Sequence, residues 1–97
     1  MRVTFDPAAS DELNGIFTWI AKDSPRAAFE MLARIEAKVM RLETPALTHM
    51  GRPGLVEGTR ELVEWPYIIV YKVYEARDEI VIAAVVHGAQ DRERTEP

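Results

Sequence analysis

Three short apolar runs, each bounded by turn residues, fill the second half of the chain and constrain its fold most strongly. They span Thr59 to Glu64, Tyr67 to Glu75 and Glu79 to His87. β-Branched and aromatic residues are frequent in all three runs, and glycine and proline stand only at their borders, which is typical of β-strands. Because only two or three residues connect successive runs, the sequence predicts an antiparallel meander.

The residues before this meander predict one strand and two helices. Arg2 to Phe5 is short and β-prone, so we expect it to add a strand to the sheet. A helix follows from Ala8 to Lys22, because Asp6–Pro7 supplies an N-cap and a first-turn proline and apolar residues then recur at helical spacing. A second helix begins after Ser24 and runs from Pro25 to about Glu43. Joined by so short a break, the helices must form an antiparallel hairpin.

The order of these elements predicts an α+β fold, in which an N-terminal strand and a two-helix hairpin pack on an antiparallel β-sheet meander (β-α-α-β-β-β). We expect the first strand at the sheet edge or beside the last strand. Ala46 to Glu57 is predicted to be a loop, because Gly51, Pro53 and Gly54 oppose a regular element. Residues 1–97 suffice for a single domain, with residues 88–97 as a polar, partly disordered tail.

Composition excludes several classes of protein. The chain has no cysteine, which excludes disulfides and thiolate metal sites and suits a reducing cytoplasm. No apolar run approaches the ~20 residues of a membrane helix, and a net charge of −4 argues against nucleic-acid binding by the chain alone. His49 and His87 lack a carboxylate at ligand spacing. We therefore expect a cytoplasmic protein that needs no metal or cofactor and binds neither membrane nor DNA by itself.

Short motifs along almost the whole chain resemble the RelE/ParE superfamily of bacterial toxins. In chain order they are Val3, Phe5, Ala9, Asp11 and Leu13; Ser24, Pro25 and Ala28; Leu42 and Pro45; Gly51 and Arg52; Gly58 to Leu62; Tyr67 and Ile69 to Tyr71; and His87. The order and spacing of these residues carry the resemblance, since none of them is specific alone. The resemblance implies the fold described above and a toxin that an antitoxin, encoded beside it, holds inactive.

Within the superfamily, the chain is most similar to the ParE-type toxins of type II toxin–antitoxin modules, which serve plasmid or chromosomal stabilisation. That similarity implies inhibition of DNA gyrase by protein–protein binding, and neutralisation by a ParD-type antitoxin in a hetero-oligomer. One alternative is a RelE-type, ribosome-dependent mRNA endonuclease, and another is an inactive homologue that acts only as a co-repressor. The long loop offers only His49 and Arg52 against Glu57. This shortage of cations argues against phosphate chemistry and leaves the other two readings open.

We therefore expect no catalytic residues and no enzymatic activity. If the chain were a ribonuclease, Arg60 would supply a cation for the phosphate and His87 would act as the general acid. We interpret Arg60 instead as a structural residue that forms a salt bridge at the start of a strand, because an unpaired buried charge is costly. We interpret His87 as a half-buried residue that ends the last strand.

Large apolar residues outside the core stripes of the helices predict a groove for an antitoxin helix. The predicted antitoxin-binding residues are Trp19, Phe29, Met31, Ala33 and Met40, with Arg26 and Arg34 at the rim. The alternative is that these faces meet each other inside the hairpin. Since this chain is acidic, and many family antitoxins are too, attraction between net charges cannot be the main source of affinity, so we expect apolar burial to dominate.

Overall fold

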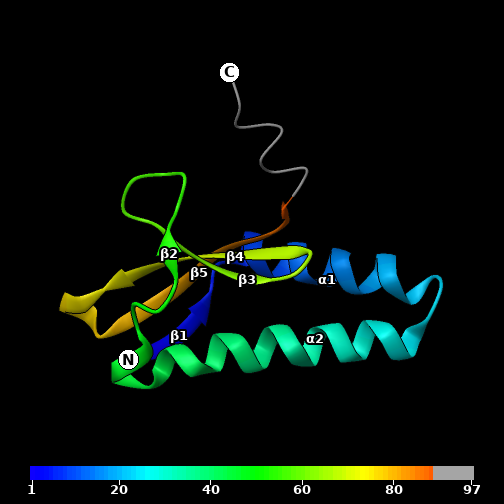
Figure 1. Ribbon diagram of the computed structural model, residues 1–97, viewed down its shortest axis with the longest axis horizontal. Helices are drawn as coiled ribbons and strands as arrows, with labels where there is room; N and C mark the ends of the chain where they lie inside the picture. Colours follow the sequence, from blue (N-terminus) through cyan, green and yellow to red (C-terminus); the bar gives the residue numbers. More distant parts are fainter. Residues whose placement is uncertain (89–97) are drawn as a thin grey trace.

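The computed structural model describes residues 1–88, which form a five-stranded sheet with a helical hairpin packed on one face (Figure 1). The strands, in the spatial order β1-β5-β4-β3-β2, are β1 (Arg2–Phe5), β5 (Glu79–His87), β4 (Tyr67–Tyr74), β3 (Arg60–Glu64) and β2 (Arg52–Pro53). The helices are α1 (Pro7–Ala21) and α2 (Pro25–Met40). Across residues 1–88, neither helix is long and apolar enough to cross a membrane. The predicted tail from residue 89 onward lies outside the described residues.

The predicted α+β fold and meander are confirmed, with one difference in the direction of pairing. Strands β3, β4 and β5 are antiparallel neighbours, but β1 pairs with β5 in parallel. The first strand is therefore both at the sheet edge and beside the last strand, as expected, while the description of the whole sheet as antiparallel was wrong for this pair. A parallel pair needs a long crossover between its strands, and here the helical hairpin and the rest of the meander supply it.

Both helices begin where the sequence predicts. The Asp6 side chain accepts a hydrogen bond from the backbone N–H of Ala8 at 2.9 Å, and the Ser24 hydroxyl accepts one from Ala27 at 3.1 Å. Each cap satisfies a backbone donor that has no partner within its helix. Helix α2 ends at Met40, before the predicted end at Glu43, and Arg41–Glu43 continues the chain as a single 3₁₀ turn.

The core lies between the hairpin and the sheet face that the hairpin covers. Strand residues alternate between the two faces, so Ile69 and Tyr71 of β4 and Ile80 and Ile82 of β5 all face the helices and are fully buried. Apolar residues that recur at helical spacing along α2 and the 3₁₀ turn after it pack against these strand residues. The fully buried ones are Ala28, Ile35, Val39 and Leu42, and Leu32 is partly buried.

The long loop before β3 contains an element that the sequence did not predict. Arg52–Pro53 forms β2, whose residues pair with Glu61 and Arg60 of β3 at the sheet edge. A proline is tolerated there because an edge strand leaves one side of its backbone unpaired. A two-residue strand that contains proline shows no hydrophobic alternation, so the pattern on which strand prediction depends is missing.

Candidate protein-binding site

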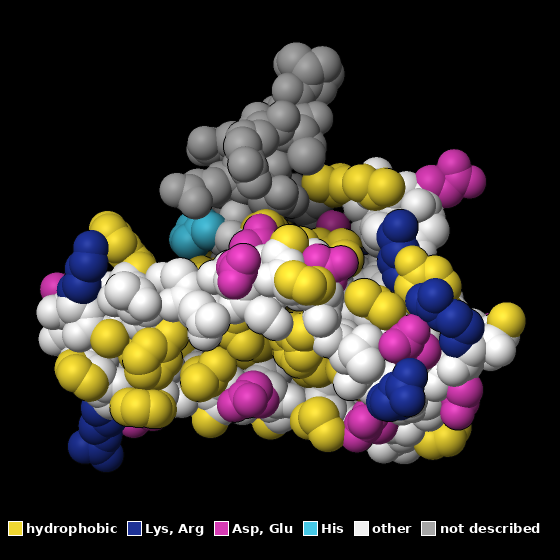
Figure 2. All heavy atoms as spheres, turned by 180° about the vertical axis from the view of Figure 1, so that it is seen from behind, with side chains coloured by type: hydrophobic (Ala, Val, Ile, Leu, Met, Phe, Trp, Pro, Cys, Tyr) yellow, Lys and Arg dark blue, Asp and Glu magenta, His cyan; other side chains and the backbone are white. Residues whose placement is uncertain are grey.

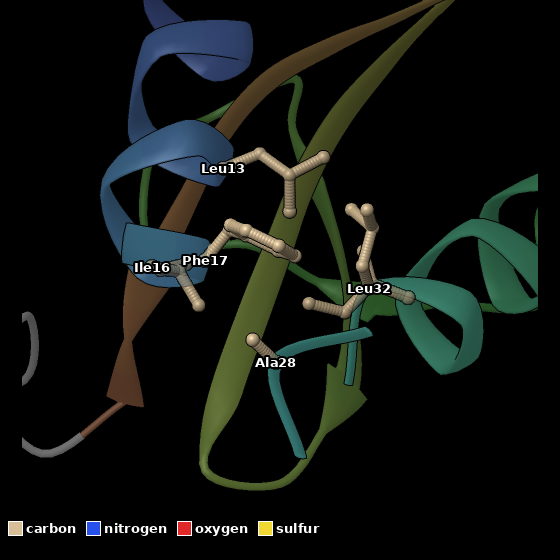
Figure 3. A pocket seen from close by; sticks show the side chains of 6 residues that line it. Leu13, Ile16, Phe17, Ala28 and Leu32 are labelled. Atoms are coloured by element: carbon tan, nitrogen blue, oxygen red, sulfur yellow. The ribbon is translucent and has the colours of Figure 1, made fainter. Parts of the chain in front are cut away.

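A shallow apolar hollow lies between α1 and α2 (Figure 3). Its walls are Leu13, Ile16 and Phe17 from α1, and Ala28, Leu32 and Ile35 from α2. These side chains point toward one another from the two helices. The hollow is lined by hydrocarbon and one aromatic ring, and it is too narrow to admit a water molecule. It is therefore part of the packed contact between the helices, and any partner must bind on the surface beside it.

Phe29 extends the hollow to the surface of the hairpin. Its ring meets the ring of Phe17 edge-on, with 4.9 Å between centroids and an interplanar angle of 75°, a geometry that aromatic pairs prefer. Phe29 is nevertheless 61% exposed. The pair therefore forms a supported aromatic wall, one side of which is open to a partner.

The alternative that the predicted apolar residues meet each other inside the hairpin is wrong for the largest of them. Trp19 is 69% exposed and Met40 is 53% exposed, in addition to Phe29. The helices contact each other instead through the residues that line the hollow, which occupy a neighbouring face of each helix. Exposed apolar side chains of this size mark a surface available for binding.

The predicted residues on α2 divide between two sides of the helix. Phe29, Ala33 and Met40 lie within about 40° of one another around the axis, and Arg26 lies close to them. By the same geometry, Met31 and Arg34 lie about 140–160° away from Phe29.

The contacts of the charged rim residues agree with this division. Arg34 Nε is 3.4 Å from a carboxylate oxygen of Glu64 at the end of β3, and its Nη2 is 3.5 Å from the sulfur of Met31. Arg26 pairs along the helix with Glu30 at 3.2 Å. Arg26 thus borders the Phe29 side of α2, whereas Arg34 pairs with β3 and Met31 is partly buried against the core.

Trp19 also stands apart from the hollow. It follows Phe17 by two residues on α1, which places the two side chains about 160° apart around the helix. The Nζ of Lys22 lies 5.4 Å from the centre of the indole ring. The structure thus brings Phe29 beside Phe17, leaves Ala33 and Met40 on the Phe29 side of α2, and places Trp19 on the other flank of α1.

Arg60 is held at the start of β3 by the backbone of the preceding segment. Its Nη2 donates a hydrogen bond to the carbonyl oxygen of Gly51, and its Nε is buried with no hydrogen-bond partner among residues 1–88. The predicted salt bridge of Arg60 is wrong for residues 1–88, because the guanidinium binds a backbone carbonyl instead of a carboxylate. The guanidinium is therefore turned toward the β2 edge of the sheet.

His87 lies directly opposite Tyr67 across the β4–β5 ladder, and the two rings meet edge-on with 5.8 Å between centroids. Its Nδ1 is buried and has no hydrogen-bond partner within the described part of the chain. Burial raises the pKa of the Tyr67 phenol above its ordinary value of 10.0. His87 is thus partly buried at the end of the last strand, as its interpretation from sequence expected.

The structure does not bring Arg60 and His87 together. They pair with Tyr71 and Tyr67, which are four residues apart on β4, and they do so on opposite sides of that strand. Four residues span about 13 Å and two strand spacings about 10 Å, so the two backbone positions lie roughly 16 Å apart. His49 is farther still from His87, because it contacts Glu75 at the opposite end of β4.

The sequence did not indicate two apolar features of the structure. Phe17 and Leu13 line the hollow against α2, whereas helical spacing alone predicts only that they lie at or near the core face of α1. Leu55 and Val56, in the loop after β2, are 53% and 66% exposed. A pair of branched aliphatic residues between glycines was the available signal for the loop, since such residues are unusual at an exposed turn.

Comparison with solved structures identifies the class of protein that this fold defines. The chain superposes on a chain of the chromosomal ParDE toxin–antitoxin system from P. aeruginosa with a TM-score of 0.75 and 26% identity, over 90% of this chain and 95% of that one. It superposes on a chain of the toxin–antitoxin complex RelBE2 from Mycobacterium tuberculosis with a TM-score of 0.61 and 25% identity, over 89% and 95%. The fold is that of the RelE/ParE superfamily, as predicted.

The sequence comparisons then give the family. Residues 3–92 match the profile of the family described as "ParE toxin of type II toxin-antitoxin system, parDE". The chain is also 41% identical over 92 residues to a candidate toxin, Y4kP, of Sinorhizobium fredii, which covers 92% of this chain and 90% of that protein. The chain therefore belongs to the ParE toxins of type II toxin–antitoxin systems, and the predicted membership is confirmed.

Proposed function

We propose that this ParE toxin inhibits DNA gyrase by protein–protein binding, and that a ParD-type antitoxin neutralises it by packing an amphipathic helix against the outer surface of the α1–α2 hairpin, on the side of Phe29. The observation that carries the antitoxin part is the aromatic wall of Phe17 and Phe29, which is packed on one side and open on the other. Exposed apolar anchors on a receptor surface are a usual means of binding the apolar face of an amphipathic helix. The solved ParDE and RelBE2 structures, described as toxin–antitoxin systems, support such a partner.

The separation of Arg60 and His87 supports a toxin that acts by binding. RNA cleavage needs an acid, a base and cations around one phosphate, whereas these two residues are anchored roughly 16 Å apart. Arg60 is turned toward Gly51, away from β5. A RelE-type nuclease remains the runner-up, because the chain also superposes on the RelBE2 structure, and an inactive co-repressor is the third reading.

The antitoxin site is tested by two aromatic substitutions that differ in position but not in exposure. We expect Phe29→Ala to cost about 2 kcal/mol or more in antitoxin binding, a loss of roughly 30-fold in affinity, because it removes a supported anchor. Trp19→Ala is the matched control, since Trp19 is equally exposed but lies on the other flank of α1. The measurement is calorimetric titration of each folded variant with the cognate antitoxin. A large loss with Trp19→Ala and none with Phe29→Ala would place the antitoxin on the other flank.

The gyrase target is tested in a purified system. We expect the toxin to block supercoiling by gyrase, the antitoxin to relieve the block, and His87→Ala to leave the inhibition unchanged. In parallel, translating ribosomes are incubated with the toxin and the mRNA is examined for cuts. Site-specific cuts that disappear with Arg60→Ala or His87→Ala would establish the nuclease instead. A chain that does neither, and causes no growth arrest when it is induced alone, would be the co-repressor.

A further inference from the structure

A second apolar feature projects from the opposite part of the molecule. Residues 54–58 form a loop between β2 and β3 that stands out from the sheet, away from α2 (Figure 1). Leu55 and Val56 lie in this loop and are more than half exposed, and hydrophobic side chains are visible on the projection in Figure 2. Neither residue belongs to the core, so the packing of the fold does not explain why they are apolar.

The loop is held in one shape by hydrogen bonds at both of its ends. Gly54 N–H donates to the carbonyl of Thr59 at 2.9 Å, and Thr59 donates back to the carbonyl of Val56 through its N–H at 3.1 Å and its hydroxyl at 2.5 Å. Leu55 N–H donates to a carboxylate oxygen of Glu61 at 3.3 Å. The exposed side chains therefore sit on a braced backbone.

Glu61 is the centre of this bracing. Its side chain is only 2% exposed, and Arg52 Nε lies 3.1 Å from its second carboxylate oxygen. A carboxylate is costly to bury unless it is paired and hydrogen-bonded. Its burial beneath an exposed loop shows that the loop conformation is specified by long-range contacts from β2 and β3.

Two glycines complete the fixed shape. A Cβ at Gly54 would lie 2.1 Å from the hydroxyl oxygen of Thr59, so a side chain at this position would displace the Thr59 side chain that braces the loop. Gly58 has a φ of 85°, a region that glycine adopts without strain. A loop defined in this way loses little conformational entropy when it binds, because it is already ordered.

The charges around the loop select the class of partner. Arg52, the cation at its base, is paired with Glu61, and Glu57 adds an exposed negative charge at the loop itself. Phosphate binding requires available cations, and this loop instead offers two branched aliphatic side chains. The fitting partner is a folded protein with an apolar pocket.

We propose that Leu55 and Val56 insert into an apolar pocket on the cellular target protein of the toxin, and that this contact is distinct from the antitoxin site. The inference rests on the proposed function in one respect, namely that the toxin acts by binding a protein. The hollow lies between the helices, whereas the loop extends from the sheet away from α2 (Figure 1). A helix bound on the Phe29 side of the hairpin therefore leaves Leu55 and Val56 accessible.

The test is a double substitution, Leu55→Ser with Val56→Ser, in the full chain. Both residues are exposed, so we expect an unchanged thermal melt and unchanged affinity for the antitoxin. We expect the toxin concentration that half-inhibits gyrase to rise at least about tenfold, because two anchors are lost, and growth arrest on induction to weaken in parallel. Trp65→Ser is the matched control, since Trp65 is 70% exposed in the turn at the other end of β3. It should leave inhibition unchanged.

The outcomes separate this inference from the proposed function. If the wild-type chain inhibits gyrase and the double variant inhibits it equally well, the loop inference is overturned and the gyrase proposal stands. If the wild-type chain arrests growth without inhibiting gyrase, and the double variant loses the arrest, the gyrase proposal fails while the loop inference stands. Loss of antitoxin binding by the double variant would assign the loop to the antitoxin and overturn the inference. A wild-type chain that is not toxic would also overturn it.

Discussion

The hydroxyl of Tyr71 joins the long segment before β3 to the core, and its removal should be costly. Tyr71 is fully buried on β4. Its hydroxyl donates to the carbonyl of Thr48 at 3.1 Å and accepts from the N–H of Gly51 at 3.1 Å. The carbonyl of Gly51 in turn accepts the hydrogen bond from Arg60. One phenolic oxygen therefore positions the backbone on which Arg60 depends.

The substitution Tyr71→Phe deletes this oxygen and keeps the ring. It leaves one buried carbonyl and one buried N–H without their partner, and each such group costs about 1–3 kcal/mol. For two such groups we therefore expect the free energy of unfolding to fall by roughly 2–6 kcal/mol, a large part of the 5–15 kcal/mol available to a typical domain. For a chain of this length the melting temperature should fall by at least about 10 °C.

The assay is urea denaturation followed by circular dichroism, with Tyr74→Phe as the control. Tyr74 is on the same strand but is 37% exposed, and its ring lies against the guanidinium of Arg77 at 4.2 Å. The loss of its hydroxyl should change stability by no more than about 0.5 kcal/mol. A Tyr71→Phe variant as stable as the Tyr74→Phe variant would refute the reasoning, because it would show that the two backbone groups find other partners at no cost.

Two further predictions concern the last strand and the tyrosine opposite its end. Glu12 of α1 accepts a hydrogen bond from Val85 N–H of β5 at 3.0 Å. Glu12→Ala should therefore lower the free energy of unfolding, measured by urea denaturation, by about 1–3 kcal/mol. Glu12→Gln keeps an acceptor and should recover most of that loss. The folded-state pKa of Tyr67 is raised above 10.0, so its contribution to stability is full below pH 10 and is lost as the pH rises through the raised value. The alkaline decline in melting temperature should therefore be shallower in Tyr67→Phe than in the wild-type chain. An identical decline in both would contradict the assignment.

Local sequence was sufficient for the elements themselves and for the family. Each helix start depends on two neighbouring residues, the cap and the first-turn proline, and both caps are observed. The meander follows from alternation within single strands, and Ile69 and Tyr71 are buried together for that reason. These signals lie within a few residues of one another, so they can be seen without the rest of the chain.

Tertiary structure decided which of the predicted binding residues share a surface. Phe29 and Trp19 have the same apolar character and nearly the same exposure, but the rotation of α1 against α2 places Phe17 beside Phe29 and turns Trp19 away. On α2, tertiary packing also buries part of Met31 against the core while leaving Phe29 exposed. The periodicity of one helix does not define its rotation relative to another, which depends on how the two surfaces pack.

Only long-range pairing could decide the remaining features. The parallel contact of β1 with β5 joins strands far apart in the sequence, and the two-residue β2 exists only because it pairs with β3. The same pairing separates Arg60 from His87 along β4 and buries Glu61 beneath the 54–58 loop. The amino-acid sequence alone thus determined the two helices, the four longer strands and the family. The sheet register and the helix packing decided which side chains meet, because these contacts join residues that no local pattern connects.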